Sequence, residues 1–191
     1  NRWIAWADER GHVSVVDIDQ RSPRVEFDSG LNNVHLAFSP GGTTLAVAGE
    51  GDPPIQLRSV TTGESRPLAT GMSAVRAVAF VDAGAKLAAA HADGKLILWN
   101  LEGGQPFTTV DATPLASLAA NSNGKWLAGG GLNGELHLWN TATMTPKHVP
   151  AAHESEILTV AFSPDDRSIA TASKDGRICR WRVPNLKREL S

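Results

Sequence analysis

The feature that most constrains this chain is a unit of about 41 residues that recurs along nearly its whole length. A Leu or Ile followed by Ala marks the same place in each unit, and successive pairs stand 41, 42, 40 and 42 residues apart. The pairs are Ile4-Ala5, Leu45-Ala46, Leu87-Ala88, Leu127-Ala128 and Ile169-Ala170. A repeat of this length indicates one supersecondary unit that buries its apolar face by stacking on its neighbours.

The fullest unit, from His153 to Trp181, shows what each repeat folds into. Apolar and polar residues alternate in three short runs, and clusters of Pro, Asp and Gly separate the runs. This pattern predicts short antiparallel strands joined by hairpins. A fourth strand, often with a proline suited to an outer edge, is expected between units at 24–28, 65–69, 106–110 and 146–150.

Four short strands in a unit of this length are typical of one blade of a β-propeller. We therefore expect an all-β fold, with residues 1–191 forming a single, partial propeller domain. The first unit lacks an innermost strand, so about four to five four-stranded antiparallel blades are expected, as part of a longer propeller. The repeat units are placed at about 1–28, 29–69, 70–110, 111–150 and 151–191.

Composition excludes several classes of function. The chain carries a formal net charge of −2, which argues against a nucleic-acid or anionic-membrane partner. No apolar run reaches the roughly 20 residues of a membrane span, and no signal peptide is visible, so a cytoplasmic location is expected. The single cysteine, Cys179, excludes an internal disulfide and a multi-cysteine metal site.

The units resemble WD repeats, and the resemblance covers essentially the whole chain. In the last unit it rests on Phe162-Ser163-Pro164-Asp165, Asp175-Gly176 and Trp181. Earlier units supply Phe38-Ser39-Pro40-Gly41, Asp93-Gly94, the segment 96–100 and the segment 136–140. The resemblance implies a WD-repeat β-propeller array of about five repeats. The many alanines and glycines in simple repeats look like those of a bacterial WD protein.

The resemblance implies a hydrogen-bonded tetrad in the last unit, formed by His153, Thr171, Asp175 and Trp181. In such a tetrad a hydroxyl, a carboxylate and an imidazole satisfy one another and the indole N–H inside a mostly apolar blade. The network is lost in two other units, whose matching positions hold Ala89, Asp93 and Gly71 before Trp99, and Gly129, Asn133 and Asp111 before Trp139.

Three members of the tetrad also have the residue types of a hydrolytic triad. The spacing of a WD tetrad accounts for all of them, so we expect no catalytic residue. The run Gly129–Gly131 precedes no helix and no Lys-Ser/Thr follows it, which excludes a phosphate-binding loop. The histidines show no metal-ligand spacing, and neither a metal nor a cofactor is expected.

The resemblance further implies a partner-binding face, lined by the residue before the turn Asp and by two positions at the entry of each innermost strand. An apolar centre with charged flanks suits protein recognition, although such positions can also be merely exposed and small. The positions are Ala74, Arg76, Ala92, Pro114, Ala116, Leu132, Glu156, Leu158 and Lys174, with Asn32, Val34 and Glu50 as their counterparts in the second unit.

The sequence thus favours a non-catalytic protein–protein interaction scaffold or sensor module that binds a protein or peptide on one propeller face. Additional blades, from the rest of the chain or from another subunit, are expected as further partners. Two alternatives remain open, a propeller enzyme with a site in the central channel and a nucleic-acid-binding propeller. The innermost strands carry His35, Arg76 and little else that ionises, which counts against the enzyme.

Overall fold

The computed structural model describes residues 2–19, 22–69 and 72–189, and it consists of five antiparallel sheets. Sheet 1 contains β1 (Trp3–Ala7), β2 (His12–Asp17) and β3 (Ser22–Asp28). Sheet 2 contains β4 (Asn32–Phe38), β5 (Thr44–Glu50), β6 (Ile55–Ser59) and β7 (Ser65–Ala69). Sheet 3 contains β8 (Val75–Val81), β9 (Lys86–His91), β10 (Lys95–Asn100) and β11 (Gln105–Asp111).

Sheet 4 contains β12 (Leu115–Ala120), β13 (Trp126–Gly131), β14 (Leu136–Asn140) and β15 (Pro146–Val149). Sheet 5 contains β16 (Ile157–Phe162), β17 (Ser168–Ser173), β18 (Ile178–Arg182) and β19 (Lys187–Glu189). The one helical turn in the described residues is η1 (Asp82–Gly84). The expected unit limits at residues 1, 70 and 191 fall outside the described residues.

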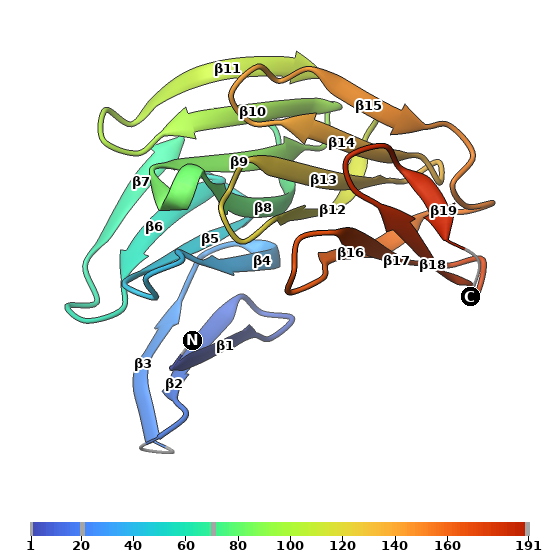
Figure 1. Ribbon diagram of the computed structural model, residues 1–191. Helices are drawn as coiled ribbons and strands as arrows, with labels where there is room; N and C mark the ends of the chain where they lie inside the picture. The colour runs from blue at the N-terminus through green and yellow to red at the C-terminus, as the bar shows by residue number, and fades with distance from the viewer. Residues whose placement is uncertain (1, 20–21, 70–71, 190–191) are drawn as a thin grey trace.

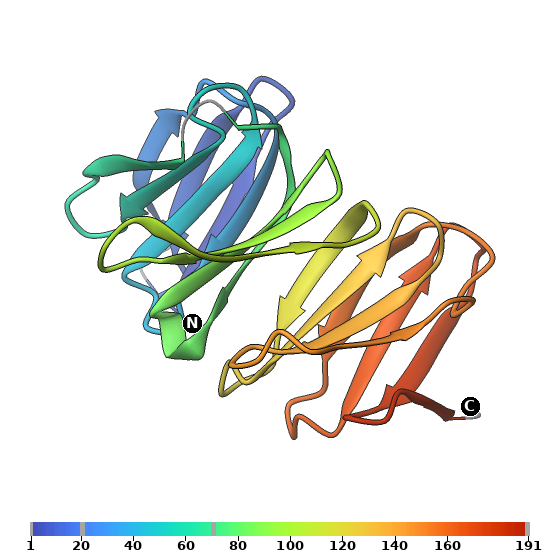
Figure 2. The ribbon, with the colours of Figure 1, turned by 90° about the horizontal axis from the view of Figure 1, so that it is seen from above.

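The five sheets follow one another around an arc, from β1–β3 to β16–β19 (Figure 1). Within each sheet the strands are paired in sequence order, and β4, β8, β12 and β16 lie side by side at the inner side of the arc. In the view from above, the first and last sheets lie on opposite sides of the array (Figure 2). No described strand of sheet 1 pairs with sheet 5, so the arc is an open, partial propeller. The all-β propeller prediction is confirmed.

In sheets 2 to 5 the repeated Leu/Ile-Ala pairs lie on the second strands, where the Leu or Ile side chain is buried in the core, whereas Ile4-Ala5 lies on β1, the first described strand of sheet 1, and Ile4 is exposed. Leu87, Leu127 and Ile169 are fully buried, and their partners on the third strands are Trp99, Trp139 and Trp181. Each Trp belongs to a core cluster that includes residues of the preceding sheet, so the main apolar contact is between sheets. Burial of an aromatic ring at each boundary holds consecutive blades together.

Sheet 2 departs from this pattern, because Arg58 pairs with Leu45 at the position that Trp holds in sheets 3 to 5. The Arg58 guanidinium lies over the ring of Phe27 in sheet 1, with its carbon 3.6 Å from the ring centroid. It also donates from Nη1 to the Gly63 carbonyl at 2.8 Å. A cation–π contact therefore replaces the indole at the boundary between sheets 1 and 2.

Glycine is required in β13 because neighbouring side chains approach its backbone. A Cβ on Gly129 would lie 2.9 Å from the Trp139 ring, and a Cβ on Gly130 would lie 2.6 Å from Ile157 Cγ2. The glycine run therefore lets the indole and the next sheet come close to the strand, as expected for a crowded strand.

The two outermost sheets leave apolar side chains exposed. Ile4 and Trp6 are exposed on sheet 1, and Leu158 and Ile178 are exposed on sheet 5, where Ile178 reaches 76%. Beside them Arg180 forms an ion pair with Glu189 of the adjacent strand at 2.9 Å. Among the described residues, no helix is long and apolar enough to cross a membrane.

Candidate functional site

In sheets 2 to 5, the start of the first strand lies beside the turn between the second and third strands. These segments together form a rim that we call the channel mouth. In three sheets one backbone hydrogen bond ties the turn between the second and third strands to the entry of the first strand. The equivalent bonds run from Ala92 N to Ala74 O (2.8 Å), from Leu132 N to Pro114 O (2.9 Å) and from Lys174 N to Glu156 O (3.0 Å). These six positions, all among the predicted binding residues, are thereby held at the rim.

A β-bulge interrupts the first strand of each of these sheets at the channel mouth. The strand pairing skips Arg76 in sheet 3, Ala116 in sheet 4 and Leu158 in sheet 5, and it skips Asn33 and Val34 in sheet 2. An unpaired bulge residue re-aims its side chain out of the regular alternation of the strand. The bulged positions coincide with the predicted innermost-strand positions Val34, Arg76, Ala116 and Leu158.

Residues of four sheets meet in a hollow of about 300 Å³ at the channel mouth, the channel-mouth hollow. Among the predicted residues, Glu50, Arg76, Ala116, Leu132 and Glu156 line it, whereas Asn32, Val34, Ala74, Ala92, Pro114, Leu158 and Lys174 do not. Its described lining is completed by Asn33, His35 and Val75. The bulges are the signal that could have pointed to Asn33, but a sequence does not show where a strand loses its pairing.

The charged groups of the channel-mouth hollow are not equally engaged. Glu156 pairs with Lys174 Nζ at 2.6 Å, and Glu50 accepts from Asn33 Nδ2 at 2.9 Å. Arg76 is exposed, and no described residue forms an ion pair or hydrogen bond with its guanidinium. The hollow therefore offers one guanidinium without an ion-pair or hydrogen-bond partner among the described residues, beside an apolar wall formed by Ala116 and Leu132.

His35 faces the same hollow as a neutral group. Burial lowers the pKa of His35 most, the charge of Arg76 lowers it further, and Glu50 opposes both. Because its pKa lies below the usual value, the imidazole is uncharged at neutral pH and can donate or accept one hydrogen bond. The hollow thus combines a cation, a neutral ring and two carboxylates that already have partners.

The four predicted tetrad residues are joined by a continuous chain of hydrogen bonds in sheet 5. His153 Nδ1 lies 3.0 Å from Asp175 Oδ2, and His153 Nε2 lies 2.7 Å from Thr171 Oγ1. Trp181 Nε1 donates to Thr171 Oγ1 at 2.9 Å. With the imidazole proton on Nδ1, every donor in the chain has an acceptor, which makes the network self-sufficient and buried.

Asp175 is held as a carboxylate by this network. Burial is the largest influence and raises the pKa of Asp175, but the backbone N–H groups of Glu154 and Arg177 and the imidazole of His153 together outweigh it. The pKa of Asp175 falls to about 2. The same group thereby accepts from three donors and closes the turn before β18.

In sheets 3 and 4 the hydrogen-bonding groups around the buried Trp differ from those of sheet 5. Trp99 Nε1 is buried and has no hydrogen-bond partner among the described residues, and Ala89 supplies no hydroxyl. Gly71, the counterpart of His153 in that unit, lies outside the described residues. In sheet 4 a different network forms around His137, whose Nε2 contacts Thr113 Oγ1 at 2.9 Å and Glu135 Oε2 at 3.1 Å.

The spacing of a WD tetrad, applied to Trp139, does not predict the sheet 4 network around His137. His137 lies on the same strand as Trp139, and their rings stack with centroids 5.2 Å apart. Burial lowers the pKa of His137, although Glu135 opposes this shift, so the ring stacks as a neutral imidazole. In the described part of the chain, no group of three or more His, Cys, Asp or Glu residues is placed to hold a metal ion.

Comparison with known proteins agrees with the class that this fold defines, a WD-repeat β-propeller. The family model "WD domain, G-beta repeat" matches residues 65–100, 104–140 and 144–182, which is more than half of the chain. The chain belongs to the WD-repeat family. Each matched segment begins on or just before the last strand of one sheet and ends with the third strand of the next, so every repeat links two sheets.

Three curated relatives illustrate how far the similarity extends. The chain is 24% identical to Protein LST8 homolog of Drosophila melanogaster, over 92% of this chain and 60% of that protein. It is 25% identical to WD repeat-containing protein 55 of Arabidopsis thaliana, over 85% and 48%. It is 30% identical to Protein ROOT INITIATION DEFECTIVE 3 of Arabidopsis thaliana, over 54% and 24%. The chain therefore spans less than two thirds of each relative.

Proposed function

We propose that this chain is a non-catalytic protein-interaction module that binds a peptide segment of a partner protein at the channel mouth. The observation that carries the proposal is the channel-mouth hollow, which gathers side chains of four sheets around the unpaired Arg76 guanidinium. Membership of the WD-repeat family supports a scaffold role. A guanidinium beside an apolar wall suits a peptide with a carboxylate next to an apolar side chain.

The hollow could be considered as an enzyme site, because His35, Glu50 and Glu156 meet there. Both carboxylates, however, are engaged within their own sheets, and no described Ser, Thr or Cys lines the hollow as a nucleophile. The tetrad of sheet 5 is a self-sufficient network, which supports a structural role for His153 and Asp175. We therefore propose that the chain is not an enzyme.

A nucleic-acid partner is not part of this proposal. The formal net charge is −2, and the hollow contains two carboxylates against one arginine. Phosphate backbones are bound by clusters of Lys and Arg, so the chain should not be retained on heparin. A cytoplasmic location remains a prediction from the sequence.

The proposal is tested by selecting displayed random dodecapeptides on the immobilised chain and measuring the affinities of enriched peptides by fluorescence anisotropy. Peptides that bind the hollow should lose affinity about tenfold or more on Arg76→Glu, since a charge-assisted pair becomes a repulsion. Arg167→Glu is the matched control, because it makes the same charge change at an exposed turn between β16 and β17. Enriched peptides that are all insensitive to Arg76→Glu, or no enrichment at all, would overturn it.

Further blades are proposed as a second kind of partner, to cover the exposed apolar side chains of sheets 1 and 5. Light scattering after size exclusion tests this idea on the 20.2 kDa chain. We expect self-association that Trp6→Lys and Ile178→Lys reduce, because an open apolar sheet face seeks cover. A monomer at all concentrations would argue against it.

A further inference from the structure

The turn between the third and fourth strands has the same backbone in four sheets. An N–H to carbonyl hydrogen bond of 2.7 to 2.9 Å closes each turn, and its donor residue has a left-handed φ between 51° and 76°. The donors are Gly63, Gly104, Met144 and Leu186, which bond to Ser59, Asn100, Asn140 and Arg182. This position therefore accepts a large apolar side chain as well as glycine.

In sheets 4 and 5 this turn residue fills the space against the preceding sheet. Met144 is 8% exposed and belongs to a core cluster that also holds Leu98 and Ala120. Leu186 is 6% exposed and belongs to a cluster with Leu138 and Phe162. We call each of these two side chains a plug, because it is buried at one end of the boundary between two sheets.

Sheet 3 has Gly104 at this position, and the boundary with sheet 2 has a groove of about 830 Å³. Leu57 and Phe80 line this groove. Leu57 holds the strand position of Leu98 and Leu138, and Phe80 holds the strand position of Ala120 and Phe162. A Cβ on Gly104 would meet nothing closer than Arg66 Nη1 at 3.9 Å. A phenylalanine at the position of Phe80 does not make the plug unnecessary. Sheet 5 has Phe162 at the same strand position, and its core cluster still contains Leu186.

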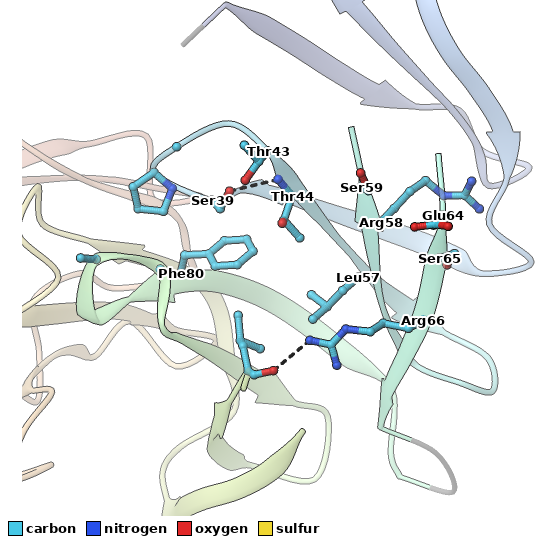
Figure 3. A pocket seen from close by; sticks show the side chains of 15 residues that line it. Ser39, Thr43, Thr44, Leu57, Arg58, Ser59, Glu64, Ser65, Arg66 and Phe80 are labelled. Carbon is cyan, nitrogen blue, oxygen red and sulfur yellow. Dashed lines mark hydrogen bonds between the residues drawn. The ribbon is translucent and has the colours of Figure 1, made fainter. Parts of the chain in front are cut away.

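The rim of this inter-sheet groove is polar, and Arg66 is the cation that points across it, since the Arg58 guanidinium lies over Phe27 of sheet 1. Arg66 reaches across it and donates from Nη2 to the Leu101 carbonyl at 2.9 Å, shown by a dashed line in Figure 3. Arg58 and Glu64 also line the groove, together with the hydroxyl groups of Ser39, Thr43, Thr44, Ser59 and Ser65. The remaining N–H groups of Arg66 can still receive a carboxylate.

The inter-sheet groove lies on the face opposite to the channel mouth. Its turns join β4 to β5, β6 to β7 and β8 to β9, whereas the channel mouth is formed by the turns from second to third strands. In an antiparallel sheet these two sets of turns lie at opposite strand ends. The groove is therefore separate from the channel-mouth hollow.

We propose that the inter-sheet groove is a second binding site, for a peptide segment of a partner protein that inserts one Leu or Met side chain. The inserted side chain takes the space that Met144 and Leu186 fill at the next two boundaries. A carboxylate within the same segment pairs with Arg66 at the rim. The apolar contact supplies affinity and the guanidinium supplies orientation, as in other anchored peptide sites.

The test uses Gly104→Met, which gives sheet 3 the plug of sheet 4. Random dodecapeptides are selected by display on the wild-type chain, and enriched peptides are titrated by fluorescence anisotropy. We expect a class of peptides with Leu or Met close to Asp or Glu, whose affinity falls about tenfold or more on Gly104→Met. Replacement of the peptide's Leu or Met by Ala should have a similar effect, and Arg66→Gln a smaller one.

Matched controls separate this site from loss of folding and from the channel mouth. Gly103→Met adds the same side chain next to Gly104, where no atom lies within 4 Å of the new Cβ, and should leave affinity unchanged. Arg76→Glu should also leave this class unchanged. Circular dichroism should show Gly104→Met folded, with a thermal midpoint no lower than wild type, and Gly104→Leu serves if it is not.

Three results would overturn the proposal: no enriched peptide at all, peptides without an aliphatic anchor, or peptides that bind Gly104→Met as tightly as wild type. Peptides sensitive only to Arg76→Glu would belong to the channel mouth. They would count against the groove while supporting the other site, so the two proposals fail separately.

Discussion

Trp181 donates its indole N–H to Thr171 Oγ1 at 2.9 Å, and this bond joins the third strand of sheet 5 to the second inside the core. The same oxygen lies 2.7 Å from His153 Nε2, so three elements of the sheet converge on one hydroxyl. Thr171 is almost fully buried, and water cannot replace it. The hydroxyl is therefore the node of the network.

Replacing the node by an isosteric apolar side chain should be costly. Thr171→Val leaves the indole N–H and the imidazole without a partner in the interior, and we expect a loss of about 2–3 kcal/mol in the free energy of unfolding. Urea denaturation followed by tryptophan fluorescence measures it. Thr159→Val, at an exposed position of β16, is the control. Equal midpoints for the two variants would contradict the role of Thr171 as the node.

The two buried indoles of sheets 3 and 5 should respond differently to loss of their N–H groups. Trp181→Phe removes a hydrogen bond, whereas Trp99→Phe removes an N–H that has no described partner. Both rings are similarly buried, so the cost in packing should be similar. We expect Trp181→Phe to lower the free energy of unfolding by about 1 kcal/mol more than Trp99→Phe. Chemical denaturation of both variants measures the difference, and a larger loss for Trp99→Phe would refute this comparison.

Acid should weaken the sheet 5 network through Asp175. Its pKa is about 2 in the folded chain against an ordinary value of 3.8, so folding favours the carboxylate. The stability that this group contributes is fully present above the ordinary pKa and is lost as the pH falls through that value toward about 2. Urea midpoints between about pH 6 and pH 2 should fall less steeply for Asp175→Asn than for wild type.

The control for this titration is Glu102→Gln, which removes one negative charge from an exposed turn. It should leave the acid limb of the stability profile close to that of wild type. If Asp175→Asn and wild type lose stability in parallel below about pH 5, another carboxyl group governs the acid limb.

The charge of Arg76 should be visible in the titration of His35. Arg76 lowers the pKa of His35 across the channel-mouth hollow, so Arg76→Gln should raise that pKa toward the usual value without reaching it, because burial remains. Nuclear magnetic resonance of the imidazole Cε1–H signal during a pH titration measures the shift. Arg66→Gln, on the opposite face, should leave the pKa of His35 unchanged. A lower pKa in Arg76→Gln would show that the two groups do not interact as described.

The glycines of β13 should not tolerate a methyl group. Gly129→Ala would bring Cβ within 2.9 Å of the Trp139 ring, and overpacking of this kind typically costs about 1–3 kcal/mol. Gly103→Ala, with no atom within 4 Å of the new Cβ, is the matched control and should be nearly neutral. Thermal unfolding compares them. If Gly129→Ala unfolds at the wild-type temperature, the indole can move away at little cost.

Much of the fold could be predicted because its signals are local. The Leu/Ile-Ala pairs, the alternation and the turn residues predicted the second, third and fourth strands close to where they lie. The spacing of a WD tetrad before Trp181 located three residues, His153, Thr171 and Asp175, that the structure joins to one another and to Trp181 by hydrogen bonds. The same spacing before Trp139 does not lead to His137. The His137 ring comes from the strand of Trp139 itself, and its partners, Thr113 and Glu135, come from a loop and a turn.

The sequence by itself determined the repeat, the strand pattern and the residues that come to the channel mouth, because side-chain alternation and turn chemistry act over a few neighbouring residues. Only the tertiary structure decided which of those residues line one hollow, because the bulges at Arg76 and Ala116 depend on the pairing of whole strands. It alone also revealed the groove between sheets 2 and 3. The space between two sheets depends on side chains far apart in the chain, and no local pattern records whether they fill it.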